Sequence, residues 1–284
     1  MKHLEKPELC TKDIVLTCAD SYRVETRDGL KNKLIAAADL IHDESGRYHE
    51  AMSNGELSYF TPQNIVNGNI STGDMCDTYD NKFVKNASIR NKYYNKIMAC
   101  ATTGKCPICG IGQVSNLDHY LAKTLYPVYA ITPYNLTPVC RDCNFSKLDS
   151  DINTECAPFH PYYDEIDSDE WLKARLIVTN GSFAAEYFVN PDLLRNNEQL
   201  YNRLVLHMGM YALAKAYAIQ AATEISENSY MWKRKLNEWG ENAFREYLCD
   251  CLISKEKSQR NTWNTALLRA LIMNVGIIDQ LEDS

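Results

Sequence analysis

The residues best suited to chemistry lie in one stretch, residues 106–147. Two Cys-x-x-Cys pairs bracket it: Cys106 with Cys109, and Cys140 with Cys143. Four thiolates in two compact pairs are typical ligands of a structural, tetrahedral zinc ion. The turn-like sequence CPICG around the first pair favours zinc over two disulfides or four buried free thiols. Because four sulfurs complete the coordination of zinc, such a site pins the ends of the stretch together and leaves no open position for a reaction.

A group of polar side chains lies between and just after the cysteine pairs: Asp118, His119, Asn135, Asn144 and Lys147. Phosphodiester hydrolysis needs a water molecule made nucleophilic near pH 7 and a cation on the scissile phosphate. Histidine has the unperturbed pKa that suits the first task. The oxygens of Asp and Asn suit a hard cation such as Mg²⁺ or Mn²⁺ rather than zinc. The stretch therefore carries the parts of a metal-dependent hydrolase.

In type and order, these residues resemble the HNH nuclease motif of the His-Me finger, or ββα-metal, superfamily. The resemblance covers residues 106–147 and rests on the zinc pairs and the polar positions occurring together in the family's order. It implies that His119, on a strand of a β-hairpin, is the general base on water and that Asp118 is a metal ligand. It further implies that Asn135 holds the loop and orients the base, and that Asn144 opens a helix and supplies the second metal ligand. The family often has His at the position of Asn144, but other members have Asn there.

The adjacency of Asp118 and His119 poses a geometric problem. Neighbouring residues of an ideal strand point to opposite faces, so the two side chains would not face one metal. We expect a bulge or a strand end here, or a His that reaches water from one side while Asp reaches the metal from the other. Taken singly, His119 is better interpreted as a structural histidine and Asp118 as a turn cap, but as a set between the cysteine pairs the residues favour the catalytic interpretation. Lys147 is either a phosphate contact or a solvated helix lysine.

The charge of the chain constrains how it would hold nucleic acid. The 284 residues carry a formal net charge of −7, which is unusual for a protein that relies on nonspecific attraction to phosphate. Residues 82–105 contain six basic residues and no acidic one, with Tyr93 and Tyr94 among them. We therefore expect either that basic residues are segregated onto one face or that a partner supplies part of the grip on nucleic acid. Arg90, Lys92 and Lys96 are the candidates for phosphate contact, and a solvated helix face is the alternative.

Cysteine usage and hydropathy bear on the compartment. The chain has eleven cysteines, and its N-terminus lacks the apolar segment of a signal peptide. This combination predicts a reducing, cytoplasmic setting, in which most cysteines outside the zinc pairs are small core residues. No stretch approaches the roughly twenty apolar residues of a membrane helix, so no membrane association is expected.

The pattern of apolar residues predicts a mostly helical α+β protein. We expect a ββα-metal HNH core with two zinc knuckles at 101–165, flanked by an N-terminal helical region at 1–100 and by a hairpin plus C-terminal helical region at 166–284. Helical periodicity covers 27–52, 80–101, 191–226, 229–253 and 259–281, while 1–26 and 53–79 read as irregular. Residues 171–189 read as a hairpin that turns at Asn180 and Gly181.

These observations predict a metal-dependent HNH endonuclease acting on DNA, with structural Zn²⁺ and catalytic Mg²⁺ or Mn²⁺. By analogy with stand-alone HNH proteins that carry helical additions, an anti-phage or restriction effector is the expected setting. The alternatives are a zinc-organised nucleic-acid or protein binding module without catalysis, and an RNase. Because a free nuclease endangers its host, we expect activity to depend on assembly, either as a homo-oligomer or with an ATPase or sensor subunit. A single hydrophobic core completed by residues 191–284 is the simpler alternative.

Overall fold

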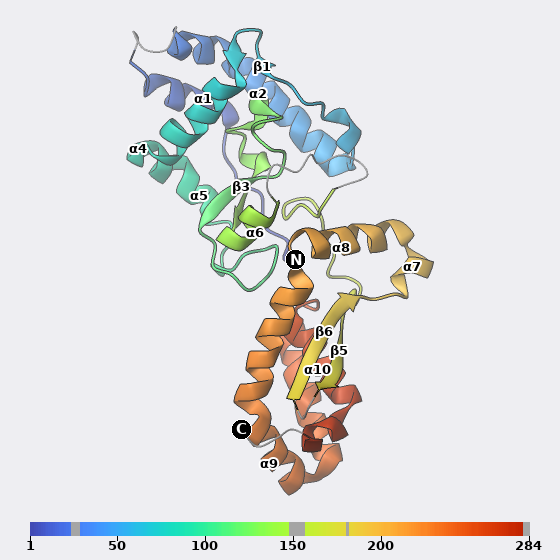
Figure 1. Cartoon of the computed structure of the whole chain (residues 1–284). Coiled ribbons are helices and arrows are strands. Elements are labelled where there is room, and N and C mark those ends of the chain that lie inside the picture. The colour runs from blue at the N-terminus through green and yellow to red at the C-terminus, as the bar shows by residue number, and fades with distance from the viewer. Residues whose placement is uncertain (24–28, 148–156, 180–181, 281–284) are drawn as a thin grey trace. The chain divides into compact units, whose positions relative to one another are not determined.

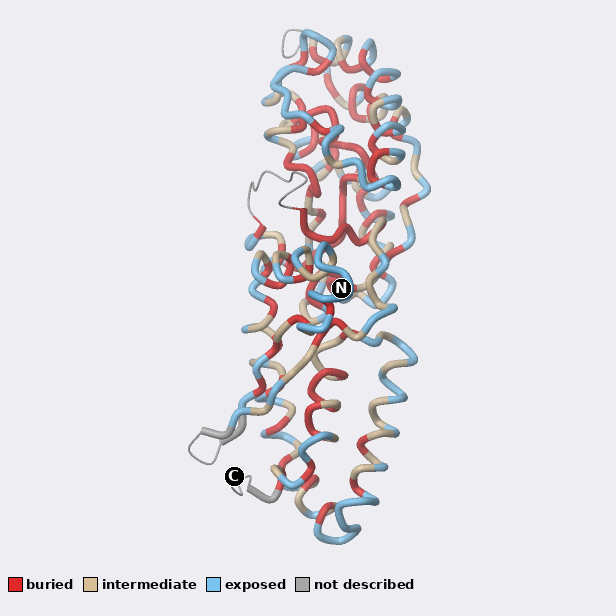
Figure 2. The backbone as a smooth tube through the Cα atoms, turned by 90° about the vertical axis from the view of Figure 1, so that its right-hand side faces the viewer, coloured by how far each residue is buried: buried red, intermediate tan, exposed pale blue. Residues whose placement is uncertain are grey.

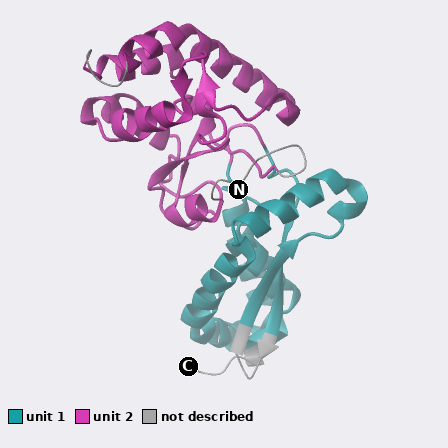
Figure 3. Ribbon diagram, turned by 45° about the horizontal axis from the view of Figure 1, so that its top comes forward, with its two compact units in different colours: residues 1–2, 165–284 teal, residues 3–164 magenta. Residues whose placement is uncertain are grey.

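The computed structural model describes residues 1–23, 29–147, 157–179 and 182–280. The chain divides into two compact units: His3–Asp164, and Met1–Lys2 together with Glu165–Ser284 (Figure 3). The architecture is α+β and mostly helical, and its described strands form three separate two-stranded antiparallel sheets. No helix among the described residues is long and apolar enough to cross a membrane.

The unit His3–Asp164 begins with two helices that pack on each other, α1 (Thr11–Asp20) and α2 (Leu30–Asn54) (Figure 1). Helix α2 buries Leu30, Leu34, Ile41 and other residues at helical spacing, as its sequence period predicts. Helix α1 corrects the expectation of irregular structure over 1–26. It has ten residues and no side-chain N-cap hydrogen bond, so its stability comes from burying one face against α2 rather than from local signals.

Residues 53–79 are more ordered than their Gly- and Asn-rich sequence predicts. It contains a short 3₁₀ turn (Leu57–Tyr59), two-residue strands β1 (Ile65–Val66) and β2 (Ile70–Ser71), and helix α3 (Thr72–Asp77). Helix α3 is started by a capping box, in which the Ser71 hydroxyl accepts from the Asp74 amide and the Asp74 carboxylate accepts from the Ser71 amide. The loop prediction for 53–79 was therefore wrong at its end.

The helical pattern over 80–101 is realised as a chain of short turns rather than one helix. Two π-helical segments (Thr78–Val84 and Arg90–Tyr94) alternate with helices α4 (Ala87–Ile89) and α5 (Asn95–Met98). The Asn86 side chain accepts from the Ser88 and Ile89 amides and so restarts the helix at α4. Buried Phe83, Ile89 and Tyr94 attach these turns to the core.

The stretch that carries the candidate chemistry folds as two strands followed by a helix. Strands β3 (Asn116–His119) and β4 (Leu136–Val139) pair antiparallel, from Asn116 with Val139 to His119 with Leu136. Two 3₁₀ turns, Pro127–Tyr129 and Pro133–Asn135, lie in the connection, and helix α6 (Arg141–Lys147) follows β4 directly. Every residue of β4 is buried, so this hairpin is part of the core of its unit (Figure 2).

The unit that contains Glu165–Ser284 is a long hairpin packed on helices. Strands β5 (Leu172–Thr179) and β6 (Ser182–Val189) pair from Leu172 with Val189 to Thr179 with Ser182. The turn predicted at Asn180 and Gly181 lies outside the described residues. Helices α9 (Leu213–Glu256) and α10 (Trp263–Met273) pack on this sheet (Figure 1), and the shorter helices α7 (Leu193–Asn196) and α8 (Glu198–Met210) precede them.

Helix α9 corrects the predicted break between 226 and 229. The helix runs through that point and is interrupted at Gly240, whose φ of 79° and ψ of 165° are not helical. Positive φ strains residues with a Cβ atom, so a glycine permits the kink here. A final 3₁₀ segment, Val275–Gln280, follows α10.

Candidate functional site

Four buried cysteines meet where the two ends of the 106–147 stretch come together. The sulfurs of Cys106, Cys109, Cys140 and Cys143 all lie within 4.8 Å of one another. All four are free, and the sulfurs of Cys109 and Cys140 are 3.8 Å apart, well beyond the S–S bond of a disulfide. Four thiols gathered in this way form a donor set that could hold a zinc ion, as their spacing predicts.

Backbone groups around the cysteines support the same interpretation. The amides of Ile111 and Gly112 lie 3.5 and 3.4 Å from the Cys109 sulfur, and the Cys143 amide lies 3.5 Å from the Cys140 sulfur. Such N–H groups stabilise the thiolate form that binds metal. A Cβ atom on Gly112 would lie only 2.6 Å from Cys140 Cβ. A glycine at position 112 therefore lets the two cysteine pairs approach.

Strand β3 delivers Asp118 and His119 to one pocket of about 330 Å³, which helix α6 completes with Asn144. His119 is the last residue of β3, so the strand end is the arrangement that lets two adjacent residues line the same pocket. The remaining lining residues are Tyr79, Leu117, Ala122, Lys123 and Phe145. Three of the predicted polar residues are thus brought together although they come from two different elements.

The imidazole of His119 is held in one tautomer. Its Nε2 lies 2.8 Å from the carbonyl oxygen of Ala130, and a carbonyl only accepts hydrogen bonds, so Nε2 carries the proton. The other nitrogen, Nδ1, makes no hydrogen bond to a described residue and keeps its lone pair. Burial lowers the pKa of His119 to about 3, and the Lys123 and Lys147 ammonium groups act in the same direction. The side chain is therefore neutral at pH 7, as proton acceptance requires, but burial also makes it a weaker base than the unperturbed histidine that the sequence argument assumed.

Asp118 is paired with Lys147, the last residue of α6. Lys147 Nζ lies 2.9 Å from Asp118 Oδ2 and also donates to the backbone carbonyl of His119. The Lys147 side chain is 2 % exposed, so its ammonium is directed into the unit rather than to solvent, unlike a solvated helix lysine. Burial raises the pKa of Asp118, and Lys147 opposes that shift.

Asn135 is buried and bonded entirely to backbone groups. Its Oδ1 accepts from the Leu121 amide at 2.7 Å, and its Nδ2 donates to the carbonyls of Leu121 and Tyr129 at 3.0 and 3.2 Å. Residue 129 precedes Ala130, whose carbonyl holds His119. The amide of Asn135 thus fixes the loop segment that orients the imidazole, and it does not line the pocket itself.

The three basic residues expected to contact phosphate differ in their surroundings. Lys92 and Lys96 are exposed. The Arg90 guanidinium packs over the Tyr94 ring at 4.2 Å and donates to the Val84 carbonyl, so Arg90 is half-buried and partly committed to the fold. The structure therefore leaves the two lysines as the more accessible charges of this segment.

Sequence reasoning missed four residues of the pocket and its surroundings. The Tyr79 ring lies edge-on to His119 at 4.4 Å. Lys123 lies over Tyr79 and pairs with Asp80. Phe145 directly follows Asn144, so the sequence could have indicated that it lies near the pocket. No sequence signal could have indicated the roles of Tyr79 and of the Ala130 carbonyl, because these depend on how the chain folds.

His160 lies outside the pocket and is a packing residue. It is fully buried, and its ring lies 4.4 Å from that of Tyr120. The Tyr162 amide donates to Nδ1 at 3.1 Å, so Nε2 carries the proton and faces the Tyr48 hydroxyl at 3.2 Å. Burial lowers its pKa well below the ordinary value. Of the six described cysteines outside the cluster, only Cys18 is buried, whereas Cys10 is exposed and the other four are partly buried.

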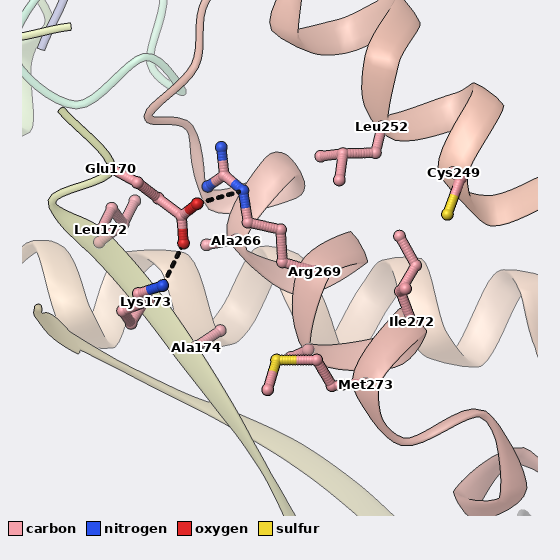
Figure 4. A pocket seen from close by; sticks show the side chains of 11 residues that line it. Glu170, Leu172, Lys173, Ala174, Cys249, Leu252, Ala266, Arg269, Ile272 and Met273 are labelled. Atoms are coloured by element: carbon pink, nitrogen blue, oxygen red, sulfur yellow. Dashed lines mark hydrogen bonds and ion pairs between the residues drawn. The ribbon is translucent and has the colours of Figure 1, made fainter. Parts of the chain in front are cut away.

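The other unit contains a second pocket, of about 320 Å³, between strand β5 and helices α9 and α10 (Figure 4). Its charged groups neutralise one another, because Glu170 pairs with both Lys173 and Arg269. Much of the remaining lining is apolar and includes Leu252 and Ile272. It therefore lacks the accessible base and oxygen ligands that the first pocket combines.

Comparison with known proteins gives one distant similarity. The chain is 24 % identical over 238 residues to a protein named ea31 of Escherichia phage lambda, covering 80 % of this chain and 78 % of the phage protein. No protein-family model matches the chain, and no solved structure matches it.

Proposed function

We propose that this protein is a metal-dependent endonuclease of the HNH type that hydrolyses phosphodiester bonds in DNA. The observation that carries the proposal is the pocket in which Asp118, His119 and Asn144 meet, with the His119 imidazole neutral and its Nδ1 free to accept a proton. The strand–strand–helix arrangement and the adjoining cysteine cluster are the context that the sequence resemblance implies.

Each residue has a definite role in this proposal. His119 Nδ1 accepts a proton from the attacking water, while the Ala130 carbonyl and the Asn135 amide network hold the ring in place. Asp118 and Asn144 hold Mg²⁺ or Mn²⁺, because a carboxylate and an amide are hard oxygen donors. The bound cation supplies Lewis acidity at the scissile phosphate. The cysteine cluster holds structural zinc and leaves the reaction to the pocket.

Lys147 contributes to the pocket indirectly, through its ion pair with Asp118. As the buried partner of Asp118, it positions the carboxylate and opposes the rise in the Asp118 pKa that burial causes. Asp118 would hold the cation together with Asn144 while remaining paired with Lys147 through Oδ2. Phosphate contacts fall to Lys92 and Lys96, and in part to Arg90.

The acidic net charge favours an assembled form of the enzyme. At −7 the chain has modest nonspecific attraction to DNA at cytoplasmic salt. We propose that a second copy, or an ATPase or sensor subunit, adds to the grip and restricts cleavage, in the setting of an anti-phage or restriction system. Sedimentation of the purified chain, together with its cleavage rate at several protein concentrations, tests this. A 32.4 kDa monomer that cuts rapidly at physiological salt, with a rate linear in concentration, contradicts it.

The experiment that tests the proposal is nicking of supercoiled plasmid with Mg²⁺, Mn²⁺ or EDTA. A nuclease converts the plasmid only with metal. A zinc-organised binding module shifts the DNA and leaves it intact under every condition. Cellular RNA incubated in parallel separates a DNase from an RNase. An intact plasmid with both metals, at protein concentrations that bind it, would refute the proposal.

A further inference from the structure

Phe145 is an exposed aromatic ring at the candidate active site. Its side chain is 74 % exposed, the most of any large hydrophobic residue described within residues 3–164. Its ring makes no aromatic contact with a described residue. Single exposed apolar side chains are common on protein surfaces, so exposure alone would mean little. Phe145, however, lines the pocket together with Asp118, His119 and Asn144.

The fold fixes the direction of this ring. Cys143 and Lys147 lie four residues apart on one face of α6 and are both buried, one in the cysteine cluster and the other against Asp118. Phe145 is two residues from each, so a 3.6-residue period directs it to the opposite face. Turning α6 to bury Phe145 would break one of these anchors.

An exposed ring beside a phosphodiesterase pocket has one well-matched ligand surface, the face of a nucleic acid base. Aromatic stacking is tolerant of sequence because every base has such a face. In a duplex those faces are covered by neighbouring base pairs, whereas single-stranded segments expose them. Lys123 lines the same pocket, where its ammonium is paired with Asp80.

We infer that Phe145 is a stacking platform for an unpaired base, and that the preferred substrate is a single-stranded segment of polynucleotide. The inference rests on the proposed nuclease function and adds its substrate class. It makes Phe145 a specificity-determining residue, with no part in proton transfer or in holding the metal.

Binding measurements without cleavage test this inference. In a His119→Ala background with Ca²⁺, single-stranded oligonucleotides carrying 2-aminopurine report stacking by fluorescence quenching. We expect Phe145→Ala to weaken single-strand affinity by about 5- to 150-fold, the range that stacking on one aromatic spans, and to abolish the quenching. Phe145→Trp keeps both. The matched control is Tyr230→Ala, which removes a ring of similar exposure (72 %) from α9 and leaves both unchanged.

A duplex of the same sequence completes the design. Phe145→Ala is expected to change duplex affinity by less than about twofold, because a duplex offers no free base face. Single-stranded DNA and RNA arms distinguish the two sources of such a strand. Unchanged single-strand affinity in Phe145→Ala, or an equal loss for duplex, overturns the inference, the second outcome indicating a wedge between base pairs. Because these assays measure binding without cleavage, failure of the stacking inference can be distinguished from failure of the proposed nuclease function, which plasmid nicking tests.

Discussion

Lys147 Nζ lies 2.9 Å from Asp118 Oδ2, although the two residues are 29 positions apart and belong to α6 and β3. The pair joins the helix to the hairpin beside the pocket that Asp118 lines. Because Lys147 also donates to the carbonyl of His119, its ammonium contacts both adjacent residues that the proposed reaction uses.

Removing this lysine should destabilise the fold. Breaking a buried ion pair by deleting one partner costs about 3–5 kcal/mol, and Asp118 retains 16 % exposure, so we expect Lys147→Met to lower the free energy of unfolding by about 2–3 kcal/mol. Urea denaturation measures this, with exposed Lys96→Met as the control. Adding Asp118→Asn should recover part of the loss. Equal stability of the two lysine variants would show that the ion pair is not structural.

The cysteine cluster predicts a stoichiometric metal. The purified protein should hold about one zinc per chain, and Cys140→Ser should lose it and unfold at lower temperature, because binding of a structural zinc contributes to folding. Exposed Cys10→Ser is the matched control. Asn144→Ala should keep both zinc and melting temperature while losing turnover. Elemental analysis that finds no zinc in a folded, active sample would rule out the zinc assignment.

Substituting two glycines by alanine tests whether Gly112 is needed for the close approach of the cysteine pairs. Gly112→Ala places a Cβ atom 2.6 Å from Cys140 Cβ, so the cysteine pairs must move apart and zinc retention against a chelator should fall. Gly46→Ala lies within α2 with nothing within 4 Å of the new atom, and should stabilise the fold by about 0.5–1 kcal/mol. Equal zinc retention in both variants would contradict the role given to Gly112.

Buried His160 predicts a loss of stability in mild acid. Its pKa is lowered in the folded state by burial, with Lys147 and Lys6 acting in the same direction, so the unfolded chain binds the proton more tightly. The histidine therefore lowers stability as the pH falls below about 6.5, by about 1.4 kcal/mol per pH unit. His160→Gln should flatten the dependence of unfolding free energy on pH between 6.5 and 5, whereas exposed His42→Gln should not. Parallel slopes in the two variants would contradict this.

The parts of the fold that the sequence predicted are those with a strong local signal. Helix α2 follows from its apolar period, and the cysteine cluster follows from two Cys-x-x-Cys pairs that one ion would draw together. Helix α1 had no such signal, because packing on α2 supplies its stability. The kink in α9 did have a local signal, Gly240. That glycine marks the interruption better than the polar residues near 227, where the sequence analysis divided the helix.

The candidate site was predictable in its residue types but not in its contacts. The types and order of Asp118, His119 and Asn144 indicated a shared metal and base, and the structure lines one pocket with them. The Ala130 carbonyl and the Lys147 ion pair depend on the path of the chain between β3 and α6. A backbone oxygen carries no side-chain signature, and a lysine at a helix end reads as solvated until its burial is known.

Plasmid nicking by His119→Ala, beside wild type and His42→Ala, tests the central claim most directly. His42 is an exposed histidine on α2, so its removal controls for loss of a histidine as such. We expect His119→Ala to fold and bind zinc normally while its metal-dependent rate falls by about 10²–10⁴-fold, the usual contribution of a positioned base, and His42→Ala to cut at the wild-type rate. Nicking at the wild-type rate by His119→Ala would contradict the mechanism.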